Sequence, residues 1–159
     1  MRLGLLCVGR LKAGPEREIY ARYASRIAAL RNLGFAGLDL QEIDESKART
    51  PAERMAQEGA ALLAATPAGA RLVVFDERGR AASSVDFARL LESERDRGVK
   101  ALAFAIGGAE GLAPAARERA QAVFSFGAMT LPHQLVRILV AEQIYRAMTI
   151  LSGHPYHRG

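Results

Sequence analysis

The sequence predicts an α/β fold in which a mainly parallel sheet is covered by helices on both faces. Apolar runs typical of strands alternate along the chain with stretches whose apolar residues recur at helical spacing. Several predicted strands are apolar throughout, as expected for parallel strands buried on both faces. A chain of 159 residues is expected to form a single domain, residues 1–159.

The first half of the chain is predicted to contain two strands and two helices. These are a strand over 2–9, a helix over 14–33, a strand over 35–43 and a helix over 51–65. Thr50 is the predicted N-cap of the second helix, because its hydroxyl can accept a backbone hydrogen bond. Pro51 then suits the first helical position.

The second half continues the alternation. It is predicted to contain a strand over 71–76, a turn at 77–79, a helix over 85–97 capped by Ser84, a strand over 101–106, a short helix after Pro114, a strand over 122–125 and a helix over 135–152. Ligands of parallel sheets bind beyond the carboxyl ends of the strands. Three segments are therefore candidates for a site: 75–76, 107–108 and 126–133.

No segment of the sequence is predicted to cross a membrane, because no apolar run approaches about 18 residues. The N-terminal run Leu3–Val8 is interpreted as a strand, since Gly9–Lys12 follows where a signal peptide would have its cleavage site. The single Cys7 excludes an intrachain disulfide framework and is interpreted as a small buried side chain. We expect a cytoplasmic protein.

The formal net charge of +5 is compatible with a polyanionic partner such as RNA. Only three of the 22 basic residues are lysines. The arginines favour RNA, because a guanidinium can hold phosphate with two hydrogen bonds and can stack on bases. The same excess also fits a genome of biased composition, so charge alone leaves both interpretations open.

A glycine cluster follows the strand over 101–106. Gly107, Gly108 and Gly111 let the backbone bend sharply and approach a ligand closely. The spacing is neither a G-x-G-x-x-G motif nor a P-loop. It predicts either a simple tight turn or a ligand loop, in which a side chain at Gly108 would occupy the ligand's space.

The segment 126–133 connects a strand to the last helix. Its backbone amides and carbonyls can read an adenine edge, while Met129 and Leu131 supply apolar walls. His133 is predicted at the helix entrance, where the helix dipole disfavours a charged imidazole. His133 is a candidate site residue, and the alternative is a capping or core histidine.

The last helix is apolar on nearly every side. One face carries Arg137 among apolar residues, and the opposite face carries Leu135 and Leu139. Such a helix needs burial on more than one side, and a second subunit can supply one of the covering layers. Arg137 needs a carboxylate, a carbonyl or a ligand, so it is either a site residue or part of a structural ion pair.

The tail after residue 152 combines residues suited to stacking on a base and hydrogen-bonding it, namely His154, Tyr156, His157 and Arg158. The two histidines form at most half of a metal site, with no Cys or carboxylate nearby, so no metal is expected. A disordered tail is the competing interpretation.

Together these segments resemble the RlmH-type SPOUT methyltransferases of 23S ribosomal RNA over essentially the whole chain. Three blocks carry the resemblance: Ile106–Leu112, Thr130–Arg137 and His154–Arg158. The family often has Leu and Pro where this chain has Phe75 and Ala109. Both changes are expected to be tolerated, and an effect of Phe75 on packing around the cofactor is left open.

The resemblance implies a SPOUT-type α/β knot, with a C-terminal trefoil knot, and a homodimer whose active site joins both subunits. It implies S-adenosylmethionine (SAM) as cofactor. The residues that would bind SAM are Phe75, Gly108, Gly127, Ala128, Met129, Thr130, Leu131 and Pro132.

The implied reaction is methylation of N3 of a pseudouridine in helix 69 of 23S ribosomal RNA, on the assembled ribosome. N3 must lose its proton to attack the methyl group, so a proton acceptor or an anion stabiliser is needed. The candidates are His133 and His157 for the proton, with water as the alternative, and Arg137 and Arg158 for charge on a base oxygen. Competing functions are methylation of another RNA nucleotide and a noncatalytic ribosome-binding module.

Overall fold

The computed structural model describes residues 1–157. The elements are β1 (Arg2–Val8), α1 (Pro15–Ala29), the 3-10 turn η1 (Arg31–Leu33), β2 (Leu38–Ile43), α2 (Pro51–Ala65), β3 (Arg71–Ala81), α3 (Ser84–Asp96), β4 (Ala101–Ile106), α4 (Pro114–Arg119), β5 (Ala122–Ser125) and α5 (His133–Leu151). Strands and helices alternate along the whole described chain, as the sequence predicts.

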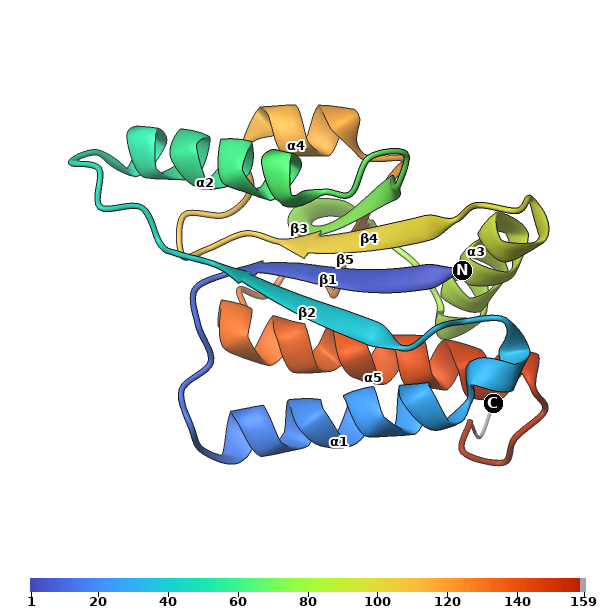
Figure 1. Cartoon of the computed structure of the whole chain (residues 1–159). Coiled ribbons are helices and arrows are strands. Elements are labelled where there is room, and N and C mark those ends of the chain that lie inside the picture. The colour runs from blue at the N-terminus through green and yellow to red at the C-terminus, as the bar shows by residue number, and fades with distance from the viewer. Residues whose placement is uncertain (158–159) are drawn as a thin grey trace.

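Five parallel strands form one sheet in the order β2-β1-β4-β3-β5. Helices α2 and α4 cover one face, and α1, α3 and α5 cover the other (Figure 1). All six residues of the central strand β4 are buried, because it has a strand on each side and helices above and below. The predicted α/β architecture is therefore confirmed.

Two predicted boundaries were wrong for local reasons. The first helix ends at Ala29 and not at Leu33, because the chain tightens into η1 and then turns at Gly34, whose φ is 89°. The cap of α3 is Ser83 and not Ser84, because Ser83 and Asp86 form a reciprocal capping box. The capping box between Thr50 and Glu53 confirms the predicted start of α2.

Two further elements are longer than predicted. Strand β3 continues through the expected turn at 77–79 to Ala81, because it pairs with β5 a second time after a register shift between Phe75 and Arg80. Gly79 permits this pairing, since a Cβ there would lie 2.5 Å from the carbonyl carbon of Phe124. Helix α5 begins at His133, two residues before the predicted start.

A buried ion pair fixes the start of α5 to the sheet. The Arg137 side chain is 1% exposed and donates to the carboxylate of Glu42 and, at 2.9 Å, to the carbonyl of Gly9. The same Glu42 oxygen accepts the backbone N–H of Leu11 at 2.7 Å. One arginine thus joins α5 to the ends of β1 and β2.

The interpretation of Cys7 as a small buried side chain is confirmed. Burial raises the pKa of its thiol to about 12, so the side chain stays neutral in the core.

Among residues 1–157, no helix has the length and apolar character needed to cross a membrane. The trefoil knot implied by the resemblance stays a prediction.

Replacing Glu42 with Ala should lower the free energy of unfolding by about 3–5 kcal/mol, because the buried Arg137 charge would lose its carboxylate. Urea unfolding at one fixed protein concentration measures the change. The matched control is Asp44→Ala, since Asp44 pairs with Arg10 at the surface, where the side chains are 80% and 67% exposed. Equal destabilisation of both variants would contradict the anchoring role of the buried pair.

Candidate cofactor and RNA site

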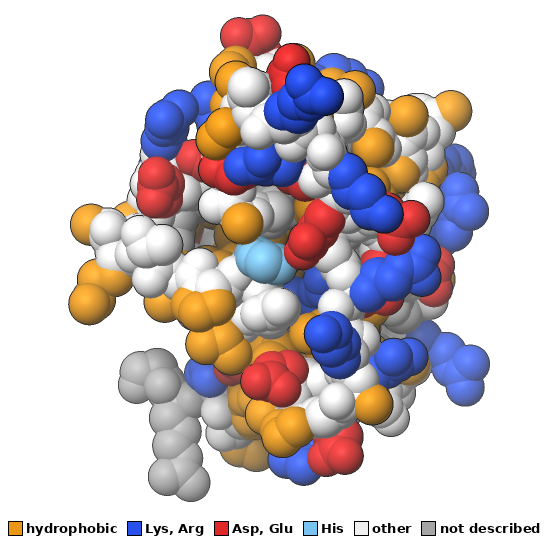
Figure 2. All heavy atoms as spheres, turned by 90° about the vertical axis from the view of Figure 1, so that its left-hand side faces the viewer, with side chains coloured by type: hydrophobic (Ala, Val, Ile, Leu, Met, Phe, Trp, Pro, Cys, Tyr) orange, Lys and Arg blue, Asp and Glu red, His pale blue; other side chains and the backbone are white. Residues whose placement is uncertain are grey.

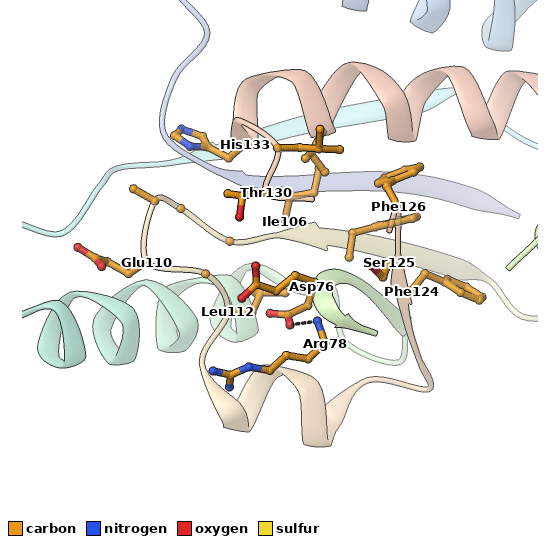
Figure 3. A pocket seen from close by; sticks show the side chains of 18 of the residues that line it. Asp76, Arg78, Ile106, Glu110, Leu112, Phe124, Ser125, Phe126, Thr130 and His133 are labelled. Carbon is orange, nitrogen blue, oxygen red and sulfur yellow. Dashed lines mark hydrogen bonds between the residues drawn. The ribbon is translucent and has the colours of Figure 1, made fainter. Parts of the chain in front are cut away.

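A pocket opens at the carboxyl ends of three neighbouring strands. Its walls come from residues 75–78 within β3, residues 106–112 at and after the end of β4, and residues 124–131 around the end of β5. His133 and Val136 at the start of α5 close it (Figure 3). The position agrees with the rule that ligands of parallel sheets bind beyond the strand ends. All three segments that the sequence singled out meet in this one pocket.

Most residues expected to bind SAM line the pocket. They are Phe75, Gly108, Gly127, Met129, Thr130 and Leu131. Ala128 and Pro132 belong to the same loop but are not among the lining residues, and Pro132 instead precedes the first turn of α5. The pocket also brings His133 to these residues, as Figure 3 shows.

One wall of the pocket is aromatic. Phe75 stacks on Phe126 with ring centroids 5.2 Å apart and an interplanar angle of 9°. Phe75 also packs against Phe87, Phe104 and Phe124 in the core, so its ring is 8% exposed. The Phe at this position therefore contacts the core as well as the pocket. A flat apolar wall of this kind suits a planar base.

The glycine loop is tight on the side that faces the protein. A Cβ on Gly107 would lie 2.6 Å from the backbone of Gly111, and one on Gly108 would lie 2.8 Å from a Glu58 oxygen and 2.9 Å from Val8. A side chain on Gly108 would therefore collide with the protein behind the loop. The sequence-based reason, that it would occupy the ligand's space, stays a prediction.

Two of the acidic residues that line the pocket are paired with arginines. Asp76 accepts the backbone N–H of Arg78 at 2.9 Å, and its other oxygen lies 3.4 Å from Arg117. Arg54 pairs with Glu110 at 2.5 Å. The sequence singled out Asp76 as part of the strand-end segment 75–76 without giving it a role, and it did not single out Arg54 or Arg117.

His133 reaches the pocket from the first turn of α5. A Cβ on Gly9 would lie 3.5 Å from Nε2 of His133 and 3.0 Å from Oε1 of Glu45, so the glycine leaves room for both side chains. The φ of Gly9 is 83°, a conformation that favours glycine. Figure 2 shows a histidine in a hollow at the centre of this face, with basic and acidic side chains around it.

Arg137, expected as a catalytic residue, lies outside the pocket lining. It stands one turn along α5 from His133, and two of its nitrogens donate to Glu42 and Gly9. Its Nε is buried and has no partner among the described residues. The position is that of a structural ion pair below the pocket.

The tail lies at the other end of α5. Tyr156 donates to Glu142 at 3.1 Å, its ring packs on Tyr145, and the guanidinium of Arg146 lies 5.0 Å from the ring centre. Desolvation, helped by the hydrogen bond to Tyr23 and the charge of Glu142, raises the pKa of the Tyr156 hydroxyl, so it stays a donor.

The two histidines of the tail lie close to Tyr156 in sequence and space. Nδ1 of His154 accepts the backbone N–H of Tyr156 at 3.1 Å, and Nδ1 of His157 is buried without a partner among residues 1–157. Arg158 lies outside the described residues. In residues 1–157 no three His, Cys, Asp or Glu side chains are grouped to hold a metal ion.

One protomer does not bring the pocket and the tail together. His133 begins α5, whereas the side chain of Tyr156 contacts Glu142, nine residues further along the helix, which is about 14 Å of rise. Figure 1 shows the two ends of α5 on opposite sides of the molecule. The predicted cofactor and nucleotide residues therefore form two separate groups in a single chain.

Comparison with known proteins gives the same family throughout. The family model described as "Predicted SPOUT methyltransferase" matches residues 1–157. Proteins called ribosomal RNA large subunit methyltransferase H from Xanthobacter autotrophicus and Methylocella silvestris are 60% and 58% identical, each over 99% of both chains. The crystal structure of a probable methyltransferase from Bordetella pertussis Tohama I shares the fold, with a TM-score of 0.54 at 16% identity over 92% of this chain and 95% of that one. With its pocket at the strand ends and a family match along its length, the chain belongs to the SPOUT methyltransferase family.

Proposed function

We propose that the protein is a SAM-dependent methyltransferase that methylates N3 of a pseudouridine in helix 69 of 23S ribosomal RNA. It acts as a homodimer on the assembled ribosome, in the cytoplasm. The observation that carries the proposal is the pocket in which the glycine loop, the loop after β5 and His133 meet. The names of the relatives at 60% and 58% identity support ribosomal RNA as the substrate class.

The residues of the pocket fit SAM. The stacked pair Phe75 and Phe126 offers a flat apolar wall for adenine, and Leu131 adds aliphatic surface. The backbone of the loop from Gly127 to Pro132 offers hydrogen-bonding groups for the edge of the base. When bound, SAM supplies an electrophilic methyl group on a sulfonium.

His133 is the group best placed to receive the N3 proton. His133 lines the pocket from the first turn of α5, and an imidazole nitrogen can accept a proton. Arg137 supports this histidine from the next turn, because its ion pair fixes the start of α5. The tail residues His154, Tyr156, His157 and Arg158 are left to bind the nucleotide.

A homodimer brings together the pocket and the tail, which are separate in a single chain. A surface of exposed apolar side chains runs from the loop after β5 onto α5, made by Phe126, Met129, Leu131, Leu135 and Leu139. Met129 is 84% exposed, which is unusual for a large apolar side chain unless another surface covers it. A second copy on this surface covers α5 on its free side and brings its own tail to the pocket.

The reaction is tested with ribosomes from a strain that lacks the enzyme. Incubation with the protein and SAM should add one methyl group to a pseudouridine in helix 69, found by mass spectrometry of nuclease-digested RNA. Methylation of another nucleotide would show a different specificity. SAM binding by calorimetry without any methylation would favour the noncatalytic module.

The dimer is tested by sedimentation at micromolar concentration, which should give twice the chain mass. Leu139→Glu should shift the protein towards monomer, because it places a charge in the apolar surface on α5. The control is Val85→Glu, since Val85 is equally an exposed apolar residue, but on the first turn of α3. A wild-type monomer, or dissociation of both variants alike, would count against this interface.

The division between pocket and tail is tested by subunit complementation. A chain shortened after Pro155 should still bind SAM but lose more than about a hundredfold in methylation, because the base is no longer positioned. His133→Ala should also be inactive. Coexpression of the two chains should restore about a quarter of the sites. About half of the dimers are then mixed, and each mixed dimer holds one complete site, made by the pocket of the shortened chain and the tail of the His133→Ala chain. If pocket and tail act within one chain, the mixture stays inactive.

A further inference from the structure

Glu58 is a buried carboxylate with an oxygen that lacks a partner. It lies on α2 and is 6% exposed. Its Oε1 accepts the backbone N–H of Ser46 at 2.9 Å, whereas its Oε2 is buried and has no hydrogen-bond partner among residues 1–157. An unsatisfied buried carboxylate oxygen costs free energy, so its presence needs a reason.

The unpartnered oxygen lies directly behind the pocket. It is 2.8 Å from the point where a Cβ on Gly108 would stand, and Gly108 lines the pocket. The carboxylate is therefore separated from the pocket by the backbone of a single glycine. Gly108 adds no side chain there, and Cγ1 of Val8 lies 2.9 Å from the same point.

No described basic side chain forms an ion pair with this carboxylate. Asp76 and Glu110, two of the acids that line the pocket, are paired with Arg117 and Arg54 respectively. Arg54, from the same helix as Glu58, also donates to the carbonyl of Ala48 at 3.1 Å. Glu58 thus has no ion-pair partner among residues 1–157.

We propose that Glu58 is a specificity-determining residue that favours a positively charged ligand in the pocket. The inference rests on the proposed function and names what the pocket distinguishes: SAM, with its sulfonium, from the demethylated product S-adenosylhomocysteine. Methyl transfer leaves the electron pair of the broken carbon–sulfur bond on sulfur, so the positive charge disappears. The attraction of the buried carboxylate is lost at the same step, which favours release of the product.

The comparison of these two ligands isolates the sulfonium. Both carry the same adenosine, ammonium and carboxylate, so contacts to those groups contribute equally to both affinities. Only the charge on sulfur and the methyl group differ. Sinefungin, which replaces the sulfonium with a carbon that bears a protonated amine, separates charge from methyl shape.

Calorimetric titration of the full-length protein with the three ligands tests the inference. Glu58→Gln removes the charge and keeps an oxygen for the N–H of Ser46. It should weaken binding of SAM and sinefungin about tenfold and change the affinity for S-adenosylhomocysteine less than about twofold. Glu58→Asp keeps the charge and should restore the preference for SAM.

Glu94→Gln is the matched control. Glu94 is also a buried glutamate with an Oε2 that lacks a hydrogen bond, but it pairs with Arg71 and Arg97 at the amino end of β3, away from the pocket. Its variant should leave the ratio of SAM to S-adenosylhomocysteine affinities unchanged.

The outcomes separate the inference from the proposed function. An equal loss of affinity for all three ligands in Glu58→Gln, or no loss at all, would overturn the charge-sensing role. If Glu58→Gln fails to fold, Glu58→Asp decides the test. A ratio of SAM affinity to S-adenosylhomocysteine affinity near one in that variant would also overturn the charge-sensing role. A wild-type protein that binds neither SAM nor its product would instead remove the proposed function.

Discussion

The buried guanidinium of Arg137 is the interaction on which the geometry of the site depends. It joins α5 to Glu42 at the end of β2 and to the carbonyl of Gly9 after β1. A charge this deeply buried is tolerated only when acceptors surround it, so the start of α5 has one position relative to the sheet. That position places His133 at the mouth of the pocket.

The pocket exists because chain segments approach each other more closely than side chains would allow. Gly107 and Gly108 lie against the backbone of the same loop and against Glu58, and Gly79 lies against Phe124. These glycines allow close packing of the protein behind the pocket wall. The pocket lies on the other side of this wall. The same close approach exposes the pocket to the charge of Glu58 through one residue of backbone.

Helix α5 separates two groups of functional residues by its own length. It is buried along one side against α1 and α3, and its exposed leucines continue the apolar loop after β5. Tyr156 follows the end of the helix, and its side chain folds back to contact Glu142 at the middle of α5 and Arg146 one turn further on. In the proposed function, a site shared between two subunits joins the pocket of one chain to the tail of the other.

The sequence by itself determined the order of strands and helices, the three strand-end segments that form the pocket, and the family, because these depend on local periodicity and contiguous motifs. It did not determine that β3 continues past its turn, since only pairing with β5 stabilises that extension. Local pattern also left open whether Arg137 contacts ligand or protein, because Glu42 and Gly9 are distant in sequence. Glu58 occupies an ordinary position in the buried stripe of α2, and only the tertiary structure places its free oxygen behind Gly108.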